Sequence, residues 1–95
     1  MDNGDDRGRE LMLDGNVAAG TLYDVFTAEM TASPTECAAC GKAGEIGDLL
    51  AFIHAPGLVL RCPACESVML RIVRTDEFTY LDARGAVYLR IARLA

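Results

Sequence analysis

Two short cysteine pairs constrain this chain more than any other feature of its sequence. They are Cys37-Ala38-Ala39-Cys40 and Cys62-Pro63-Ala64-Cys65, and 21 residues separate them. Two residues between paired cysteines let a tight turn bring both thiolates to one ion, so two such turns supply four ligands to a tetrahedral Zn²⁺. The N–H groups of each turn can point at the sulfurs and share their negative charge. The spacing therefore predicts a metal site made of Cys37, Cys40, Cys62 and Cys65.

Zinc is the expected metal, and the expected compartment supports this choice. The chain starts Met1-Asp2-Asn3-Gly4-Asp5-Asp6, which is acidic where a secretory signal is basic and then apolar. We therefore expect a cytoplasmic protein, whose thiols stay reduced rather than forming disulfides. Four thiolates leave no open coordination position, so the zinc is expected to be structural rather than catalytic. Rubredoxin-like iron and thiol-redox chemistry are the minor alternatives.

Length and charge narrow the classes of protein that fit. The 95 residues allow one small domain, and the longest apolar run is five residues, far from the ~18–20 of a membrane span. The formal charge is −5, with residues 1–47 at net −6 and residues 48–95 at net +1. This acidic balance disfavours a dedicated nucleic-acid binder, which is normally basic.

The chain divides into a short tail and one domain. Residues 1–11 contain six charges and two glycines, so we expect a disordered tail, and Met12 is an alternative start of translation. Residues 12–95 are expected to form a single domain that begins with a helix over 14–29. This helix has an apolar face that consists of Ala18, Leu22, Val25 and Phe26.

The rest of the domain is expected to be β structure. Residues 30–36 are expected to be a linker, and residues 55–58 carry Pro and Gly where a type II turn prefers them. Period-two patterns predict strands over residues 48–54, 58–61, 67–74, 78–81 and 87–92. The expected fold class is thus α+β and mainly β: an antiparallel sheet of about five strands with one N-terminal helix.

The chain resembles a known superfamily at these cysteines. The paired motifs look like those of zinc ribbons, and the segments Leu13–Gly20, Ala55–Val59 and Arg61-Cys62-Pro63 resemble a group of small, uncharacterised bacterial zinc-ribbon proteins. This resemblance implies a zinc-ribbon fold with the four cysteines as ligands, and it implies no activity. Gly41 follows the first pair, where a left-handed backbone is often needed. Glu66 takes that place after the second pair, so either that turn has a different geometry or Glu66 is modestly strained, and we expect the different geometry.

No catalytic residues are expected. His54 is the only histidine and precedes a turn, while Asp76 and Glu77 fall in a turn where carboxylates favour local hydrogen bonds. We therefore expect a non-enzymatic zinc-ribbon protein that serves as a protein-interaction module, with its pathway and oligomeric state left open. The alternative is a nucleic-acid-associated ribbon with an arginine and tyrosine sheet face, provided that the strands of Arg71 and Arg90 are neighbours. A solvated sheet face is the preferred interpretation of these arginines, which are Arg71, Arg74, Arg84, Arg90 and Arg93.

Overall fold

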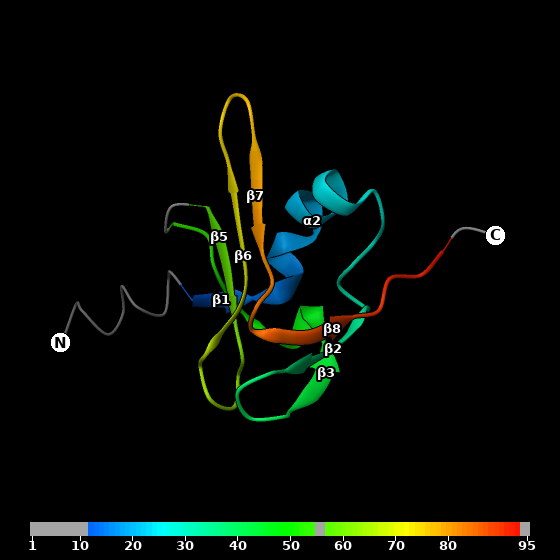
Figure 1. Ribbon diagram of the computed structural model, residues 1–95, viewed down its shortest axis with the longest axis vertical. Helices are drawn as coiled ribbons and strands as arrows, with labels where there is room; N and C mark the ends of the chain where they lie inside the picture. The colour runs from blue at the N-terminus through cyan, green and yellow to red at the C-terminus, as the bar shows by residue number, and fades with distance from the viewer. Residues whose placement is uncertain (1–11, 55–56, 94–95) are drawn as a thin grey trace, which may run out of the picture.

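The chain folds into one α-helix and two antiparallel sheets (Figure 1). The structure, a computed structural model, describes residues 12–54 and 57–93. In these ranges the elements are β1 (Met12–Asp14), the 3-10 helix η1 (Gly15–Ala18), α2 (Ala19–Phe26), β2 (Pro34–Cys37), β3 (Ala43–Glu45), the 3-10 helix η2 (Ile46–Asp48), β4 (Leu50–Phe52), β5 (Leu58–Arg61), β6 (Val68–Arg74), β7 (Thr79–Asp82) and β8 (Ala86–Leu89). The predicted α+β, mainly β class is confirmed, although the strands lie in two sheets rather than one.

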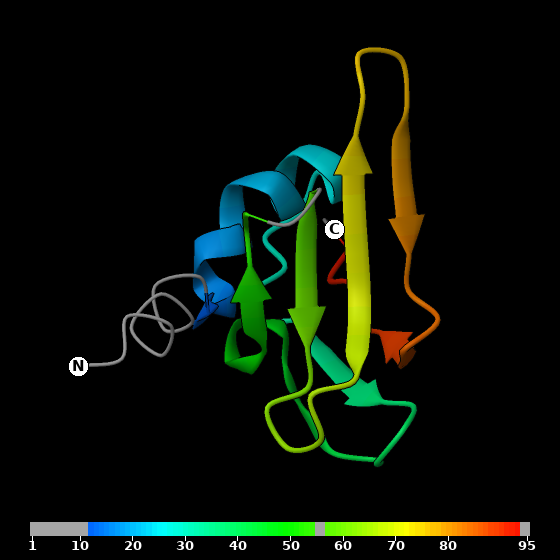
Figure 2. The same cartoon turned by 90° about the vertical axis from the view of Figure 1, so that its left-hand side faces the viewer.

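The larger sheet holds the core on one face. Its five strands have the order β1-β4-β5-β6-β7, and all neighbours are antiparallel. Leu60 on β5 lies between Ala51 and Leu70, and all three side chains are buried. Successive side chains of a strand point to opposite faces, so Val59, which pairs with Arg71, belongs to the other face. Within residues 12–54 and 57–93, no helix and no strand of the smaller sheet covers this second face, as Figure 2 shows.

Helix α2 lies behind the larger sheet, on its buried face (Figure 2). The α-helix begins at Ala19 rather than at residue 14, because Asp14 ends β1 and the 3-10 helix η1 follows it. In η1 the Asp14 carboxylate accepts a hydrogen bond from the Asn16 N–H over 2.8 Å. The helix ends at Phe26 rather than at residue 29, because Thr27 adopts the left-handed conformation and its N–H donates to Tyr23 O. The predicted apolar face is right: it packs into or against the core through Ala18, Leu22, Val25 and Phe26.

The smaller sheet was not predicted. It has the order β3-β2-β8, and β2 begins within residues 30–36, where a linker was expected. Thr35 in the middle of β2 is buried, and its hydroxyl donates to Tyr88 O on β8 over 2.8 Å. Since 53 residues separate these two partners, no local pattern reveals the pairing. The last strand also ends at Leu89, short of the predicted residue 92, and Val87 and Tyr88 are both exposed despite the expected alternation.

A tight crossing at Gly85 carries the chain from the larger sheet to the smaller one. Gly85 lies between β7 and β8 and packs directly on the backbone at the start of β6. A Cβ atom at Gly85 would lie only 1.8 Å from Val68 O, so only glycine fits here. The crossing places β8 beside β2, as Figure 1 shows.

Two predicted features lie outside the described residues: the tail over residues 1–11 and the first half of the turn, residues 55–56. Gly57 is described, and its φ of 82° suits the third position of a type II turn. In the ranges that the structure covers, there is no helix with the length and apolar character needed to span a membrane.

Candidate metal centre

The first cysteine turn (residues 37–42) leaves the end of β2 and returns into β3. Its N–H groups close it tightly: Gly41 N donates to Cys37 O over 2.8 Å, and Cys37 N donates to Lys42 O over 2.9 Å. Gly41 has a φ of 81°, as expected for this position. The turn therefore holds Cys37 and Cys40 on one side of a compact loop, anchored in the smaller sheet.

The second cysteine turn (residues 62–67) joins β5 to β6 and has the same hydrogen bonds. Glu66 N donates to Cys62 O over 2.8 Å, and Cys62 N donates to Ser67 O over 2.9 Å. Glu66 has a φ of 64°, so the prediction of a different geometry at Glu66 is wrong. The closing N–H bond requires a left-handed residue after the second cysteine, whatever its side chain. The Arg61 guanidinium also donates to Glu66 O over 2.9 Å, which ties the strained residue to β5.

The two turns bring the four thiols together. All four Sγ atoms lie within 4.8 Å of one another. Across the turns, Cys37 Sγ is 3.6 Å from Cys65 Sγ, and Cys40 Sγ is 3.7 Å from Cys62 Sγ. Four sulfurs at about 2.3 Å from a central ion would be about 3.75 Å apart. The predicted ligand set therefore forms a cluster of the size that a tetrahedral metal site needs.

Hydrogen bonds make two of the thiols unusually acidic. The hydroxyl and the N–H of Ser67 donate to Cys65 and lower its pKa to about 6. Burial opposes ionisation of Cys62, but the N–H groups of Cys65 and Ala64 outweigh it and lower the Cys62 pKa. Ala64 N lies 3.3 Å from Cys62 Sγ. These donors stabilise thiolates, which are the form that binds metal.

Cys40 shows the opposite shift because the thiols compete for charge. The N–H of Lys42 favours its thiolate, but desolvation and the three neighbouring sulfurs together raise the Cys40 pKa to about 11. Four negative sulfurs this close repel one another, so they ionise together only where a cation shares their charge. The donor set therefore suits a soft or borderline cation bound by sulfur alone.

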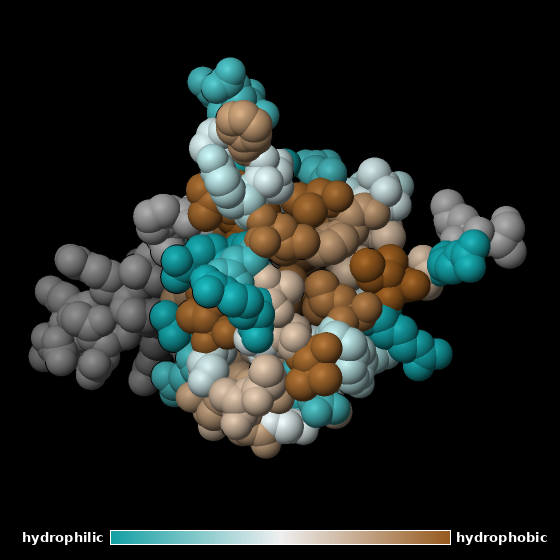
Figure 3. Space-filling model, viewed as in Figure 1, coloured by the Kyte–Doolittle hydropathy of each residue, from teal (hydrophilic) through white to brown (hydrophobic). Residues whose placement is uncertain are grey.

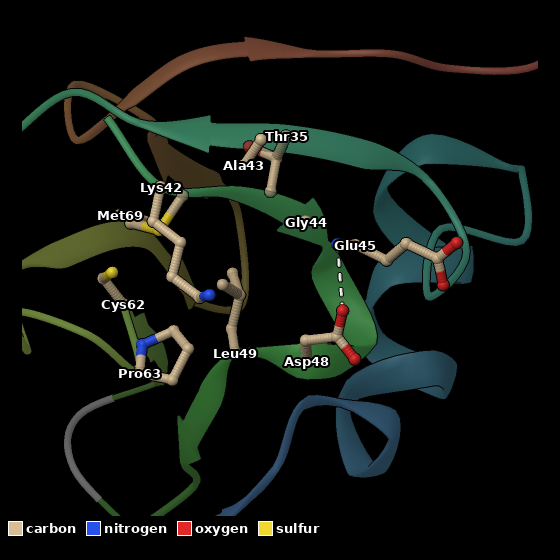
Figure 4. Close-up of a pocket in the computed structure, with 10 residues that line it drawn as sticks. All are labelled: Thr35, Lys42, Ala43, Gly44, Glu45, Asp48, Leu49, Cys62, Pro63 and Met69. Carbon is tan, nitrogen blue, oxygen red and sulfur yellow. Dashed lines mark hydrogen bonds between the residues drawn. The ribbon is translucent and has the colours of Figure 1, made fainter. Parts of the chain in front are cut away.

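A small cavity adjoins the cysteine cluster at Cys62 (Figure 4). Its volume is about 150 Å³, and its walls include Leu49, Pro63 and Met69. Two of the polar groups on its rim are engaged elsewhere, while the Lys42 side chain reaches toward Leu49 (Figure 4). Asp48 accepts the N–H of Glu45, as the dashed line in Figure 4 marks, and the Thr35 hydroxyl donates to Tyr88 O. The lining therefore offers a small recess of mixed apolar and charged character beside the thiols.

The remaining predicted site residues do not join the cluster. His54 is exposed and lies beyond Phe52, at the end of the β4–β5 pair opposite Cys62. Asp76 and Glu77 form the exposed tip of the β6–β7 hairpin. Within residues 12–54 and 57–93, the four cysteines are the one close group of three or more His, Cys, Asp and Glu ligand atoms.

The arginine and tyrosine face expected from Arg71, Tyr88 and Arg90 does not form. Arg71 lies on β6 of the larger sheet, whereas Tyr88 and Arg90 lie on or just after β8 of the smaller one. The alternative required these strands to be neighbours, and parity within a strand does not show which strands pair. Other arginines bind carboxylates: Arg74 contacts Asp24 at 3.3 Å, and Arg84 contacts Asp82 at 2.7 Å.

Comparison with known proteins identifies a family for the whole domain. A family model described as a family of unknown function, DUF6510, matches residues 7–94. The chain belongs to the DUF6510 family. This confirms the expected membership of an uncharacterised family, although no zinc-ribbon family model matches. No curated protein and no solved structure matches this DUF6510 chain, so its role has to be argued from its own residues.

Proposed function

We propose that the DUF6510 chain is a non-enzymatic protein-binding domain held together by one structural Zn²⁺ at Cys37, Cys40, Cys62 and Cys65. One observation carries the metal proposal: each sheet contributes one cysteine turn to the cluster. The first turn links β2 to β3 of the smaller sheet, and the second links β5 to β6 of the larger sheet. An ion bound by all four sulfurs therefore cross-links the two sheets.

The size of the core supports a structural role for this ion. Domains this small bury little apolar surface, and a structural metal commonly supplies the missing stability. Four thiolates fill the tetrahedral shell of zinc, so no position remains for a substrate or a reactive water. Zinc also fits the proposed cytoplasmic location, because a reducing compartment keeps the thiols available. Four thiolates and one Zn²⁺ add −2 to the formal charge of −5, giving −7.

Exposed apolar side chains support binding to a protein. Figure 3 shows hydrophobic surface spread over the face where β7, α2 and β8 meet. The large hydrophobic side chains of β7, β8 and their flanking residues that are more than 40% exposed are Phe78, Tyr80, Leu81, Val87, Tyr88 and Ile91. Clustered exposed apolar residues are typical of interaction surfaces. The acidic total charge opposes the nucleic-acid alternative.

Metal analysis of the protein purified without added metal tests the zinc proposal. We expect one zinc per chain, colourless protein, and loss of β structure by circular dichroism when a strong chelator removes the ion. Cys62→Ser is expected to lose both the bound zinc and the folded structure, because it removes a buried ligand. Ala64→Ser, in the same turn, is the matched control and should retain both. A red, iron-loaded protein, reversible disulfides between the pairs, or a stable metal-free fold would contradict the proposal.

A salt titration separates the two binding roles. Binding to phosphates weakens steeply with salt because counterions are released on binding, whereas an apolar protein contact is much less sensitive. We expect zinc-loaded protein to show no salt-sensitive binding to single-stranded or double-stranded nucleic acid. Tight binding that falls steeply with salt would favour the nucleic-acid role instead.

A further inference from the structure

Strand β7 is an open edge with unusually apolar character. The larger sheet ends at β7, and Figure 2 shows that, among the described residues, no strand or helix lies beside β7 on the side away from β6. Phe78, Tyr80 and Leu81 are 61%, 59% and 46% exposed. Natural edge strands are commonly protected by lysine, proline, a bulge or a covering loop. β7 contains no lysine or proline, and its register with β6 is regular, so it is poorly protected against pairing with another strand.

We propose that β7 pairs antiparallel with β7 of a second copy of this chain, about a two-fold axis at Tyr80. Such a pair would join the two larger sheets into one continuous sheet. The proposal deepens the proposed function by naming the partner of the protein-binding domain. It rests on that function only in requiring that the domain is folded.

The backbone of β7 is arranged for this register. Thr75 N donates to Phe78 O over 2.7 Å, which closes the β6–β7 hairpin. Hydrogen-bonding positions alternate along an antiparallel strand, so the N–H and C=O groups of Tyr80 point toward β6. The groups of Thr79 and Leu81 then point toward the open edge. A two-fold axis at Tyr80 places Thr79 opposite the partner's Leu81, and these residues can exchange four main-chain hydrogen bonds across the axis.

The side-chain faces agree with the same axis. Thr79 opposes Arg74 on β6, which contacts Asp24 of α2 on the buried side of the sheet. Leu81 opposes the buried Ile72, so Thr79 and Leu81 share this side. Residues directly opposite in an antiparallel pair must lie on one face. The pairing of Thr79 with Leu81 satisfies this condition.

The charges along the hairpin favour a second copy over an unrelated strand. Residues 71–84 carry three arginines and three carboxylates, so this segment is neutral in a chain of charge −5. The tip is acidic at Asp76 and Glu77, while Arg71 and Arg84 lie at the base. Antiparallel pairing sets the tip of one copy against the base of the other. With the axis at Tyr80, Asp76 lies opposite the partner's Arg84. In the single chain the Arg84 side chain contacts Asp82 at 2.7 Å but is 91% exposed, so it remains open to a second carboxylate.

Sedimentation velocity of the zinc-loaded full chain over a concentration series tests the proposal. We expect the mass to rise from 10.2 kDa to twice that value. Asp76→Arg and Arg84→Asp each place like charges opposite one another in two symmetry-related positions, and each alone should weaken association about tenfold. A mixture of the two variants restores both opposite-charge pairs, so it should form a heterodimer. Glu45→Arg, which changes charge at an exposed residue of β3, is the control and should leave association unchanged.

A backbone variant tests the edge itself. Thr79→Pro removes an N–H that points away from β6, a position where an edge strand tolerates proline, so the variant should fold and remain monomeric. A zinc-loaded wild-type chain that stays monomeric at every concentration overturns the proposal and leaves β7 to a strand of a different protein. A dimer that survives both Thr79→Pro and the charge reversals places the interface elsewhere and also overturns it. A chain that folds and dimerises through β7 without zinc supports this proposal while contradicting the zinc proposal.

Discussion

Gly41 and Glu66 occupy equivalent positions in the two cysteine turns, and both have a left-handed backbone. Their φ values are 81° and 64°, and each donates its N–H to the carbonyl of the first cysteine of its turn over 2.8 Å. Glycine adopts this conformation freely, whereas a residue with a side chain is strained there. The two turns thus have the same geometry, but only the second turn carries the backbone strain of a left-handed non-glycine residue.

Glu66→Gly is expected to stabilise the zinc-loaded protein. The substitution removes the strain of a non-glycine residue in the left-handed conformation, which stabilises the folded state by up to about 1 kcal/mol. The added conformational entropy of glycine in the unfolded chain offsets part of this gain. Gly41→Ala introduces the same strain into the first turn and should lower the free energy of unfolding by about 1 kcal/mol. Urea unfolding with zinc in excess measures both changes. A loss of stability in Glu66→Gly would show that the glutamate side chain contributes more than its backbone strain removes.

Two other glycines should respond to alanine in opposite directions. Gly20 lies inside α2, and a Cβ there would meet no atom within 4 Å. Gly20→Ala should therefore stabilise the protein by about 1 kcal/mol through helix propensity. Gly85→Ala forces a methyl group onto Val68 O, so we expect loss of the β7–β8 crossing and a much lower melting temperature. Equal effects in thermal unfolding of the two variants would contradict the geometry of this crossing.

Thr35→Val tests the bond that joins β2 to β8. Thr35 is almost fully buried, and its hydroxyl donates to Tyr88 O. Valine keeps the shape but removes the donor, which should cost about 1–2 kcal/mol, because the carbonyl loses a buried partner. Thr35→Ser keeps the donor and serves as the comparison. In chemical denaturation, Thr35→Ser should be less stable than wild type only by the contribution of one buried methyl group. Amide exchange at β8 should become fastest in Thr35→Val.

Asp82 should stay ionised in acid. The guanidinium and N–H of Arg84 donate to the Asp82 carboxylate and lower its pKa to about 2, with a smaller effect from the charge of Arg71. Because the folded pKa lies below the ordinary value of 3.8, this pair stabilises the fold above about pH 4. That contribution is lost as pH falls from about 4 toward 2. Carbon NMR of the carboxyl group measures the titration, and Arg84→Gln should return the pKa toward 3.8. An unchanged titration in this variant would contradict the assignment.

The parts of the fold that sequence reasoning reached depend on local patterns. The cysteine spacing, the apolar face of the first helix and the strands that carry Leu60 and Leu70 are all visible within a few residues. The smaller sheet was missed because its centre, Thr35, pairs with a strand more than fifty residues later, and because Ser33-Pro34 resembles a linker. At Glu66 the equivalence with Gly41 left two alternatives, a different turn geometry or a strained residue, and the structure has the strained residue.

The sequence predicts which four residues form the site, but it does not predict that the site links the two sheets. Spacing shows that each pair can form a turn, yet it does not show that one turn belongs to β2 and β3 and the other to β5 and β6. The arginine face failed for the same reason, since Arg71 and Arg90 were placed by parity within their own strands. Strand order depends on tertiary packing, which single-strand periodicity does not contain.

Both cysteine turns lie at one end of the molecule, and the tip of the β6–β7 hairpin lies at the other (Figures 1 and 2). Opening fluctuations of a small domain begin where buried contacts are few. Amide protection should therefore fall steadily along β6 from Leu70, which is buried near the second turn, to Thr75 at the exposed tip. Local unfolding can therefore occur at the tip of the β6–β7 hairpin while the end of the molecule that carries the four thiols remains folded.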